Sequence, residues 1–425
     1  MKRNYLLLAS LVLVFTSYAQ DAKGLLGNEN WFQNWTNFKP GIIEYKESSI
    51  ILTGLVTENT TLYKKNVYRL IGQVYVIKNA ILTIEPGTII RGDNESNATL
   101  IITKGSKIIA KGLETDPIVF TSNKNISERK AGDWGGVIVL GEAPINRFGG
   151  VGILDAGLDQ TISSYGGQDE ASNSGILKYV RIEYAGRKLK NGKEFNALSL
   201  AGVGNKTIIE YVQASFSDDD SFECYGGNVN LSNLLSYKST DDDFDFTQGV
   251  QCNIQNSIAM RYPFVSDFSK SRAMEIESYD KVENTDFTRK MTKINAVNIV
   301  LANNEENLTE GLIREAIFIK DKSNLIIDKS VITGFNSAIV VATSTLNNSK
   351  DIDSIIFKDS KINSCNKFFE CDYNGNTIAT DYQNSPYFIN NQVTRLMNVD
   401  LFREFNIKKN PDFRLRESSN FAFSK

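Results

Sequence analysis

An acidic motif recurs along this chain at a fixed spacing, and the repeat limits the possible folds more than any other feature. Residues 217–226 read SDDDSFECYG and residues 240–249 read TDDDFDFTQG, so the two copies start 23 residues apart. The likeness continues into residues 230–233 and 253–256, each of which begins and ends with asparagine. A period of this size is typical of one coil of a solenoid, whose parallel strands stack about 4.8 Å apart. We therefore predict one continuous coil, although length alone would suggest about two or three globular domains.

Short strands without hairpin turns support this prediction. From residue 74 onward, short runs rich in Val, Ile, Phe and Tyr end at Gly, Asn, Asp or Lys. Asn-Gly, a common two-residue hairpin turn, occurs only at residues 191–192 and 374–375, and Asp-Gly does not occur. Long segments with helical periodicity are lacking. The pattern predicts an all-β fold, a parallel β-helix that forms a single-stranded solenoid.

The first residues have the layout of a secretory signal peptide. Lys2 and Arg3 precede an apolar segment, residues 6–15, that is too short to span a bilayer. Residues 17–19 (SYA) then place small side chains at a cleavage site. We predict that this peptide, residues 1–19, directs export to the periplasm or the extracellular medium. Because no run of about 18 apolar residues follows, no transmembrane segment is predicted.

The mature chain divides into a coil and two ends. Residues 74–380 are predicted to form the β-helix, with a loop excursion near residues 140–175 that is rich in Gly, Asp and Ser. The end of a solenoid exposes apolar surface and unpaired strand edges, so a cap is expected there. We assign residues 20–73 to an N-terminal cap and residues 381–425 to a C-terminal cap or tail. The aromatic residues near the start of the N-terminal segment are Trp31, Phe32, Trp35 and Phe38.

Apolar and polar residues alternate within the coils, which sorts them between the interior and the outer surface. Val180, Ile182 and Tyr184 are assigned to the interior. Arg181 and Glu183, which follow them in alternation, are assigned to the surface. The 23-residue offset extends the interior set to Val212, Ala214, Phe216, Leu235, Tyr237, Ser239, Ile258 and Met260. The outward column, which we predict to bind a ligand, comprises Glu183, Ser215, Lys238 and Arg261.

The repeated motif also stacks carboxylates in adjacent turns. Like charges this close repel unless a cation or basic side chains compensate them, or unless some carboxyls stay protonated. Hard oxygen donors in this number are suited to Ca²⁺, the one cofactor that the sequence predicts. Two alternatives stay open, namely aspartates that only cap turns and aspartates that act as catalytic carboxylates. The candidate metal ligands are Asp218, Asp219, Asp220, Glu223, Asp241, Asp242, Asp243 and Asp245.

Lys238 and Arg261 lie beside this cluster on the same predicted face, and they are the candidate catalytic residues. In β-elimination on a uronic-acid polymer, bound Ca²⁺ neutralises the substrate carboxylate and acidifies the α-proton. A basic side chain then removes that proton. The alternative is that both cations only balance the charge of the aspartates.

Histidine is absent from all 425 residues, and this absence excludes several kinds of chemistry. Ser-His-Asp and Cys-His catalysis and any imidazole metal site all require it. The formal net charge is −3 and no basic block occurs, so nucleic acid is not an expected partner.

The four cysteines allow two disulfides, which an exported protein would retain. Cys365 and Cys371 are near enough in the sequence to close a local loop. Cys224 and Cys252 are spaced so that they could face each other from adjacent coils.

Several short segments of the sequence resemble motifs of one protein family. They are LTIEPGT at residues 82–88, GDWGGVIVLG at 132–141, SGILKYVRIEYAG at 174–186, DDSFECYGG at 219–227 and DDDFDF at 241–246. The chain resembles secreted bacterial proteins, frequent in Bacteroidetes, that are described as right-handed β-helix, pectin-lyase-like proteins. The resemblance spans roughly residues 30 to 415. It implies a right-handed parallel β-helix and export, but no activity, because members of the family are largely uncharacterised.

Three functions fit these observations. The first is an exported, non-catalytic protein that binds a glycan or another extracellular polymer along its parallel-sheet face. The second is a Ca²⁺-dependent polysaccharide lyase acting on uronic-acid polymers through Lys238 or Arg261. The third is a structural protein of the cell envelope. The sequence leaves the oligomeric state open.

Overall fold

The structure is a computed structural model that describes the greater part of the chain. The described residues are 30–154, 157–189, 192–262, 264–267, 271–279, 281–304, 312–313, 315–342, 354–373, 376–379 and 382–416. The predicted signal peptide, residues 1–19, lies outside the described residues.

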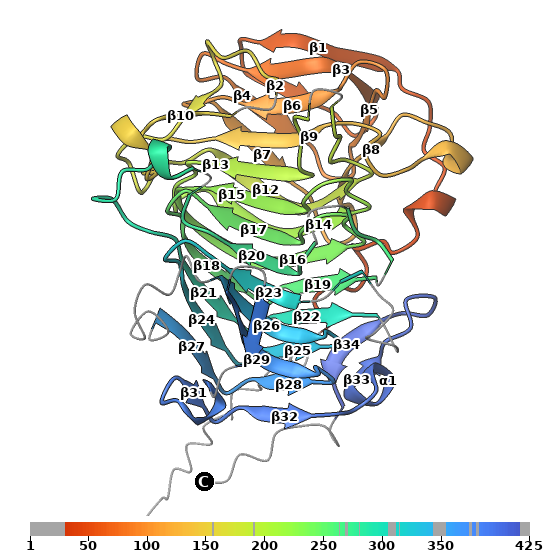
Figure 1. Ribbon diagram of the computed structural model, residues 1–425. Helices are drawn as coiled ribbons and strands as arrows, with labels where there is room; N and C mark the ends of the chain where they lie inside the picture. Colours follow the sequence, from red (N-terminus) through yellow and green to blue (C-terminus); the bar gives the residue numbers. More distant parts are fainter. Residues whose placement is uncertain are drawn as a thin grey trace, which may run out of the picture.

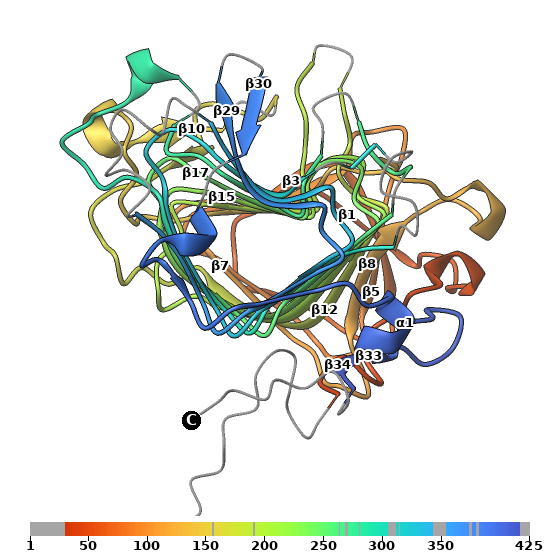
Figure 2. The same ribbon diagram turned by 60° about the horizontal axis from the view of Figure 1, so that its bottom comes forward.

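The chain coils into one long right-handed parallel β-helix, as predicted (Figure 1). Strands pair in parallel with the strands of the next coil, and nearly every coil adds one rung to each of three faces. Figure 2, which looks obliquely along the coil, shows how these rungs stack into continuous faces. Antiparallel pairing in the described residues is limited to three strand pairs and two isolated bridges, all at the margins of the coil.

The open face, named for its solvent-exposed outer side, runs along the whole coil. Its rungs are β2 (Thr60–Leu62), β4 (Ile81–Ile84), β7 (Lys107–Lys111), the first parts of β12 (Gly175–Glu183), β14 (Ile208–Ser215) and β16 (Asn228–Tyr237), β18 (Gln251–Gln255), β21 (Lys293–Val297), β24 (Asn324–Asp328), β27 (Ile355–Lys358) and β31 (Phe388–Ile389).

The strap face follows the open face in each coil. Its rungs are β1 (Ile50–Val56), the first part of β3 (Val67–Val76), β5 (Ile89–Gly92), β8 (Ile118–Ser122), the second parts of β12, β14 and β16, β19 (Ile258–Arg261), β22 (Val300–Asn303), β25 (Val331–Thr333), β28 (Lys361–Asn363) and β32 (Gln392–Thr394).

The cleft face completes each coil and carries the candidate site. Its rungs are the second part of β3, β6 (Thr99–Ile102), β9 (Gly136–Leu140), β13 (Leu198–Ala201), β15 (Phe222–Tyr225), β17 (Phe244–Thr247), β20 (Met274–Ile276), β23 (Glu315–Ile319), β26 (Ser337–Ala342) and β29 (Lys367–Tyr373), against which β30 (Asn376–Ala379) pairs in antiparallel fashion.

A single residue in the left-handed conformation makes the corner between the open face and the strap face. Tyr211, Asn233, Asn256 and Asn298 hold this place on successive rungs, with φ of 54°, 56°, 51° and 56°. Asparagine tolerates this conformation better than most residues, and its amide can also bond to the next rung. Asn298 donates a hydrogen bond to the side-chain oxygen of Asn256 at 2.5 Å. The corner therefore combines a sharp bend with a contact between coils.

The rung-to-rung register departs from the constant offset that the sequence suggested. That offset would set Val212 against Leu235, but Val212 pairs with Leu234, and Leu235 pairs with Gln213. The next rung keeps the predicted offset, since Leu235 pairs with Ile258. Because the side-chain period of a strand is two, the single slip reverses the faces. Val180, Ile182, Val212 and Ala214 lie in the interior, as predicted, but Leu235, Tyr237, Ile258 and Met260 face outward and belong to a separate apolar cluster.

The described part of the N-terminal segment, residues 30–73, does not cover the end of the coil as the cap predicted for residues 20–73 would. Its described part before β1, residues 30–49, which includes the short 3₁₀ helix η1 (Pro40–Ile42), lies along the strap face. Residues 50–73 form the first rungs, and β1 is the terminal rung in Figure 1. Aromatic side chains of residues 30–49 pack on the outward apolar set of the strap face and remove that surface from water.

The C-terminal segment packs over the same face. Residues 382–394 still belong to the coil through η6 (Tyr382–Asn384), β31 and β32. The chain then turns back through α1 (Asn398–Leu401), β33 (Phe402–Glu404) and β34 (Asp412–Leu415) (Figure 2). Phe413 stacks on Phe32 with ring centroids 5.2 Å apart, so the two ends of the chain form one strap. The strap is defined as residues 30–49 and 396–416.

An excursion leaves the coil after β9 and returns at β12, in the region predicted near residues 140–175. It contains η3 (Phe148–Gly150) and the antiparallel pair β10 (Gly152–Ile153) and β11 (Ser164–Tyr165). Two further 3₁₀ helices, η2 (Ile126–Glu128) and η4 (Val282–Asn284), lie in loops outside the coil. In the described part of the chain, no helix is both long and apolar enough to cross a membrane.

Removal of the Trp35 ring should destabilise the protein markedly. Trp35 is fully buried and packs edge-on against Tyr179 and Tyr211, at 5.8 and 6.1 Å between ring centroids. We expect Trp35→Ala to lower the free energy of unfolding by about 3–5 kcal/mol in urea denaturation. Ile42→Ala, on an exposed residue of the same segment, should change it by less than about 0.5 kcal/mol. Equal effects of the two substitutions would contradict the assignment of the strap.

Candidate functional site: an acidic cleft

A cleft of about 710 Å³ lies on the cleft face, and carboxylates line its floor. Glu223 on β15, Asp245 on β17 and Glu275 on β20 occupy the same register position on successive rungs. The strand pleat turns this position outward, because the flanking Phe222, Phe244 and Met274 point into the core. Stacking in register therefore places three carboxylates one above another at the rung spacing.

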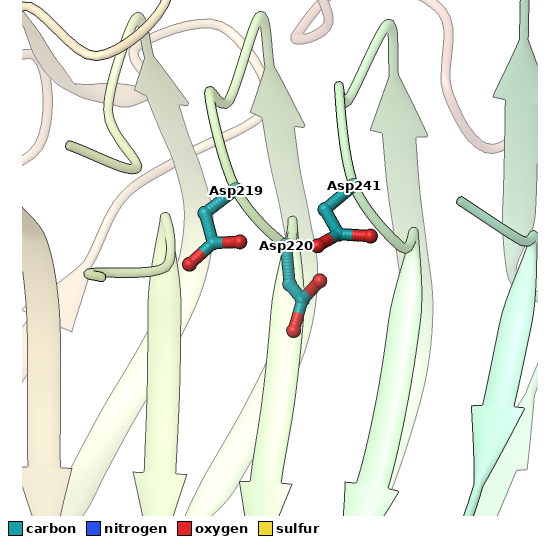
Figure 3. Close-up of side chains that lie close together, drawn as sticks. All are labelled: Asp219, Asp220 and Asp241. Carbon is teal, nitrogen blue, oxygen red and sulfur yellow. The ribbon is translucent and has the colours of Figure 1, made fainter. Parts of the chain in front are cut away.

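Corner residues just before these strands bring further carboxylates to the cleft. Figure 3 shows Asp219, Asp220 and Asp241 on neighbouring turns, with the carboxylate of Asp220 between the other two. One oxygen from each of these residues lies within 4.8 Å of the others. Asp220, Glu223 and Asp245 form a second group that meets the same limit. Asp220 thus belongs to both groups, and five carboxylates form one continuous cluster.

Hydrogen bonds within the protein satisfy this cluster only in part. The backbone N–H of Asp242 donates to Asp220 Oδ1 at 2.9 Å, and the side chains of Asn196 and Tyr225 both donate to Glu223. Asp245 Oδ1 is buried and accepts no hydrogen bond from the described residues. A buried carboxylate oxygen without a donor is costly, so this atom marks a place for a cation or for solvent.

Burial and mutual repulsion raise the pKa values of these carboxyls. Burial is the larger cause for Asp219, Asp220 and Asp245, and neighbouring carboxylates add to it, so their pKa values lie well above the ordinary range. Burial likewise raises the pKa of Glu223 to about 8, against the opposing effect of the hydrogen bonds from Tyr225 and Asn196. The cluster is therefore poorly compensated by the protein itself.

Basic side chains contact the margins of the cluster. Arg272 binds Glu275 at 2.7 Å and Glu315 at 3.1 Å, and its guanidinium lies over the ring of Phe318. Lys320 Nζ lies 2.6 Å from Glu275 and 2.7 Å from Glu277. In the described residues, Asp220, Glu223 and Asp245 form no ion pair with any basic residue.

Lys188 provides another basic contact at the edge of the cluster. Its Nζ lies 2.5 Å from Asp267 and 3.7 Å from Asp219. The centre of the cluster, away from this edge and from Arg272 and Lys320, offers oxygen ligands of the kind that Ca²⁺ binds.

Five of the eight predicted metal ligands therefore come together, and three do not join them. Asp242 lies next to the cluster, but its carboxylate accepts the backbone N–H of Arg272. Asp218 lies at the corner beside Gly132 and is outside both groups. Asp243 points into the coil and is fully buried.

Arg261 is buried inside the coil, so its prediction as an outward catalytic base is wrong. Its Nη1 donates to Asp243 Oδ2 at 2.9 Å and to the backbone oxygens of Asp241 and Arg272 at 2.7 and 2.8 Å. Neither Arg261 nor Asp243 has any exposed side-chain surface. The inward orientation follows from the rung register, in which Met260 faces outward and its neighbour Arg261 faces inward.

Lys238 also lies away from the acidic cleft. It occupies the corner after the strap face with φ of 58°, one rung after Phe216. Its ammonium faces the rings of Phe216, Tyr237 and Tyr262, not the aspartates. The predicted pairing of Lys238 with the acidic ladder is therefore wrong, because the corner turns the side chain toward the C-terminal part of the strap.

Glu183 and Ser215, the other members of the predicted outward column, face outward but are not accessible. Both are about 1 % exposed, and they pair with each other across β12 and β14. Tyr45, in the strap, lies 3.5 Å from a carboxylate oxygen of Glu183, and Arg181 lies 3.5 Å from the other. The two side chains are buried, so neither can contact a polymer as predicted.

The cysteines do not form the two candidate disulfides. All four are free and buried. Cys224 lies on the cleft face and Cys252 on the open face, so the coil separates their strands. Cys365 lies in the turn after β28, whereas Cys371 pairs with Val341 inside β29.

Sequence reasoning missed Arg272, Glu275, Glu277 and Lys320, which complete the cleft. The coil that leads from β17 to β20 is longer than the one before it, as the pairings of Phe244 with Phe222 and with Met274 show. A search at a fixed period therefore loses the register at this point. The signal that could have found Glu275 is the local pattern MEI, which repeats the FEC and FDF patterns of β15 and β17.

Comparison with known proteins assigns the fold to a family. Residues 54–398 match the model of the pectate-lyase-like β-helix domain. The chain belongs to this family. No curated protein and no solved structure matches it. Membership in the pectate-lyase-like β-helix family agrees with the resemblance noted in the sequence, and it leaves the activity open.

The stability of the cation-free protein should fall as pH rises. Because the pKa of Glu223 is raised from 4.5 to about 8, the folded state holds a proton in this interval that the unfolded chain has released. Stability is then lost progressively as pH rises from about 4.5 to about 8. We expect melting temperatures in chelator to decrease over this range, and Glu223→Gln to reduce the slope. Glu58→Gln, on an exposed residue, should leave the slope of melting temperature against pH unchanged. An unchanged slope in Glu223→Gln would contradict the raised pKa of Glu223.

Arg261 should contribute to stability and not to ligand binding. Removing one partner of a buried ion pair leaves an uncompensated charge, so Arg261→Met should lower the unfolding free energy by about 3–5 kcal/mol in urea. Adding Asp243→Asn should restore part of this loss, because the buried charge is then removed as well. Arg403→Met, on an exposed arginine, serves as the control. An Arg261→Met protein of ordinary stability would show that the ion pair is not formed.

Proposed function

We propose that this β-helix binds Ca²⁺ in the acidic cleft and, through the bound ion, an acidic extracellular glycan. The observation that carries the proposal is the cluster of Asp219, Asp220, Glu223, Asp241 and Asp245. Its carboxylate oxygens lie within 4.8 Å of one another in two overlapping groups. A divalent cation would remove the repulsion that raises the pKa values of these groups, and carboxylate oxygens are its preferred ligands.

The atom without a hydrogen bond supports this proposal independently of the acidic composition. Asp245 Oδ1 is buried and accepts no hydrogen bond in the part of the chain that the structure describes, whereas Glu223 and Asp220, on the rung before it, have donors. Turn capping, the alternative that the sequence left open, would give each aspartate a backbone donor. Asp220 has such a donor and Asp245 Oδ1 does not, so capping explains only part of the cluster.

The shape of the cleft favours a polymer over a small molecule. Its floor extends from β15 to β23, four successive rungs of the cleft face, or roughly 15 Å at the rung spacing. The excursion after β9 and the loop at residues 281–284 form its sides. Phe318 and Tyr225 add aromatic surface that can pack against sugar rings. A glycan that carries carboxylates would complete the coordination of an ion bound by the cluster.

Polysaccharide lyase activity is the second candidate, and the contacts of the basic residues favour it less. Lys238 and Arg261 do not line the cleft. Arg272 and Lys320 do, but each is engaged by two carboxylates. Burial opposes the charged form of both side chains, but these carboxylates outweigh it and raise their pKa values, which makes proton abstraction harder.

Calcium titration of the purified protein tests the proposal. We expect one or two Ca²⁺ ions to bind in isothermal calorimetry, and Asp220→Asn and Asp245→Asn each to weaken binding by about ten-fold or more, because each removes a charged ligand. Asp400→Asn, on an exposed aspartate far from the cleft, should bind as the wild type does. Wild-type protein without measurable Ca²⁺ binding would rule the proposal out.

A glycan panel then separates binding from lyase chemistry. Acidic polymers such as polygalacturonate and alginate should bind in the presence of Ca²⁺ and be released by chelator, while neutral polymers should not bind. The same mixtures are followed by ultraviolet absorbance for the unsaturated product of β-elimination. Calcium-dependent binding without product supports the binding function, and product formation that needs Ca²⁺ would establish the lyase instead.

A further inference from the structure

A second cavity lies on the strap side of the corner that follows the strap face, and it shares no lining residue with the acidic cleft. Its volume is about 880 Å³, within the range of small-molecule sites. The coil forms one side through Lys238 and Tyr262, and the C-terminal part of the strap forms the other. None of the described residues that line it is acidic, whereas three of them, Lys238, Arg395 and Lys408, are basic.

The charge of Lys238 is uncompensated by the described part of the chain. Its side chain is half-buried and forms no ion pair or hydrogen bond with a described residue. The ammonium lies 4.3 Å from the centroid of the Tyr262 ring and 5.5 Å from that of Phe216. These rings offset a small part of the cost of removing a cation from water. Burial alone lowers the pKa of Lys238, as expected where no carboxylate lies nearby.

Packing does not require a cation at this position. Tyr184 and Phe216 occupy the same left-handed corner on the two preceding rungs, and their rings stack 5.3 Å apart. A third aromatic or aliphatic side chain would continue that stack. Lys238 interrupts this stack and lines the cavity.

The other lining residues define what would fit. Arg395 and Lys408 are exposed and have no ion-pair partner in the described residues, so the positive charge of the cavity is open to a ligand. Leu396, Met397 and Phe405 form apolar surface beside these charges. An anionic group alone would leave this surface uncovered, and a neutral apolar molecule would leave the cations unpaired.

We propose that this cavity, between Lys238 and the C-terminal part of the strap, binds a small organic anion that bears a carboxylate on a ring. The carboxylate pairs with Lys238 and Arg395, and the ring lies on Leu396, Met397 and Phe405. Both an aromatic acid and a sugar acid have this chemistry, and the test distinguishes them. The site is separate from the acidic cleft and does not depend on Ca²⁺.

Matched pairs of ligands test the proposal in isothermal calorimetry on the full chain. Benzoate is compared with benzamide, and glucuronate with glucose, in chelator and again in saturating Ca²⁺. We expect one of the two carboxylates to bind at one site per chain, its neutral analogue to bind at least ten-fold more weakly, and Ca²⁺ to have no effect. The carboxylate that binds identifies the source. If neither carboxylate binds, or if both bind no better than their neutral analogues, the proposal is wrong.

Substitutions locate the bound anion. Lys238→Met keeps most of the unbranched side chain while removing the ammonium group, and it should weaken carboxylate binding by about ten-fold or more. Lys293→Met, on an exposed lysine of the open face, is the matched control and should bind normally. Should Lys238→Met fail to fold, Arg395→Gln provides the same test at an exposed position. Binding unchanged in the folded variants would place the anion elsewhere and overturn the proposal.

Discussion

Register between successive rungs is the constraint on which the rest of this structure depends. A residue in one coil lies directly over its counterpart in the next, so each side chain meets a partner chosen by the length of the coil between them. Inside the coil the constraint is favourable. Phe222 stacks on Phe244, and the aliphatic columns beside them exclude water. On the cleft face the same register brings Glu223 over Asp245 and Asp245 over Glu275.

The carboxylate cluster therefore lowers the stability of the fold at one place on the cleft face. Burial disfavours the charged forms, and stacking adds repulsion from the neighbouring rungs. Stability elsewhere must offset that cost, and the long apolar interior provides it. The Ca²⁺ ion that we propose for this cluster would remove the repulsion and so stabilise the folded chain.

Sequence patterns predicted the coil because its signals are local and repeated. The spacing of residues 217–226 and 240–249, together with the lack of hairpin turns, was sufficient to predict the parallel β-helix and the proximity of five carboxylates. The faces were harder to assign, because successive coils differ in length and each change of length shifts the register. That shift placed Arg261 outside the coil in the prediction and inside it in the structure. The strap could not be predicted either. Phe32 and Phe413 lie near opposite ends of the sequence, and neither segment has a pattern that indicates contact with the other.

The two cavities show how one coil can support separate sites of opposite charge. In each, the regular rungs supply a floor whose side chains are fixed by register, and an irregular segment supplies the wall. The excursion after β9 borders the acidic cleft, and the C-terminal part of the strap borders the cavity at Lys238. Because each wall lies outside the coil, it can change in length or sequence without moving the floor. The coil thus fixes the positions of the carboxylates and the ammonium group. The excursion and the C-terminal part of the strap limit which molecules can contact them.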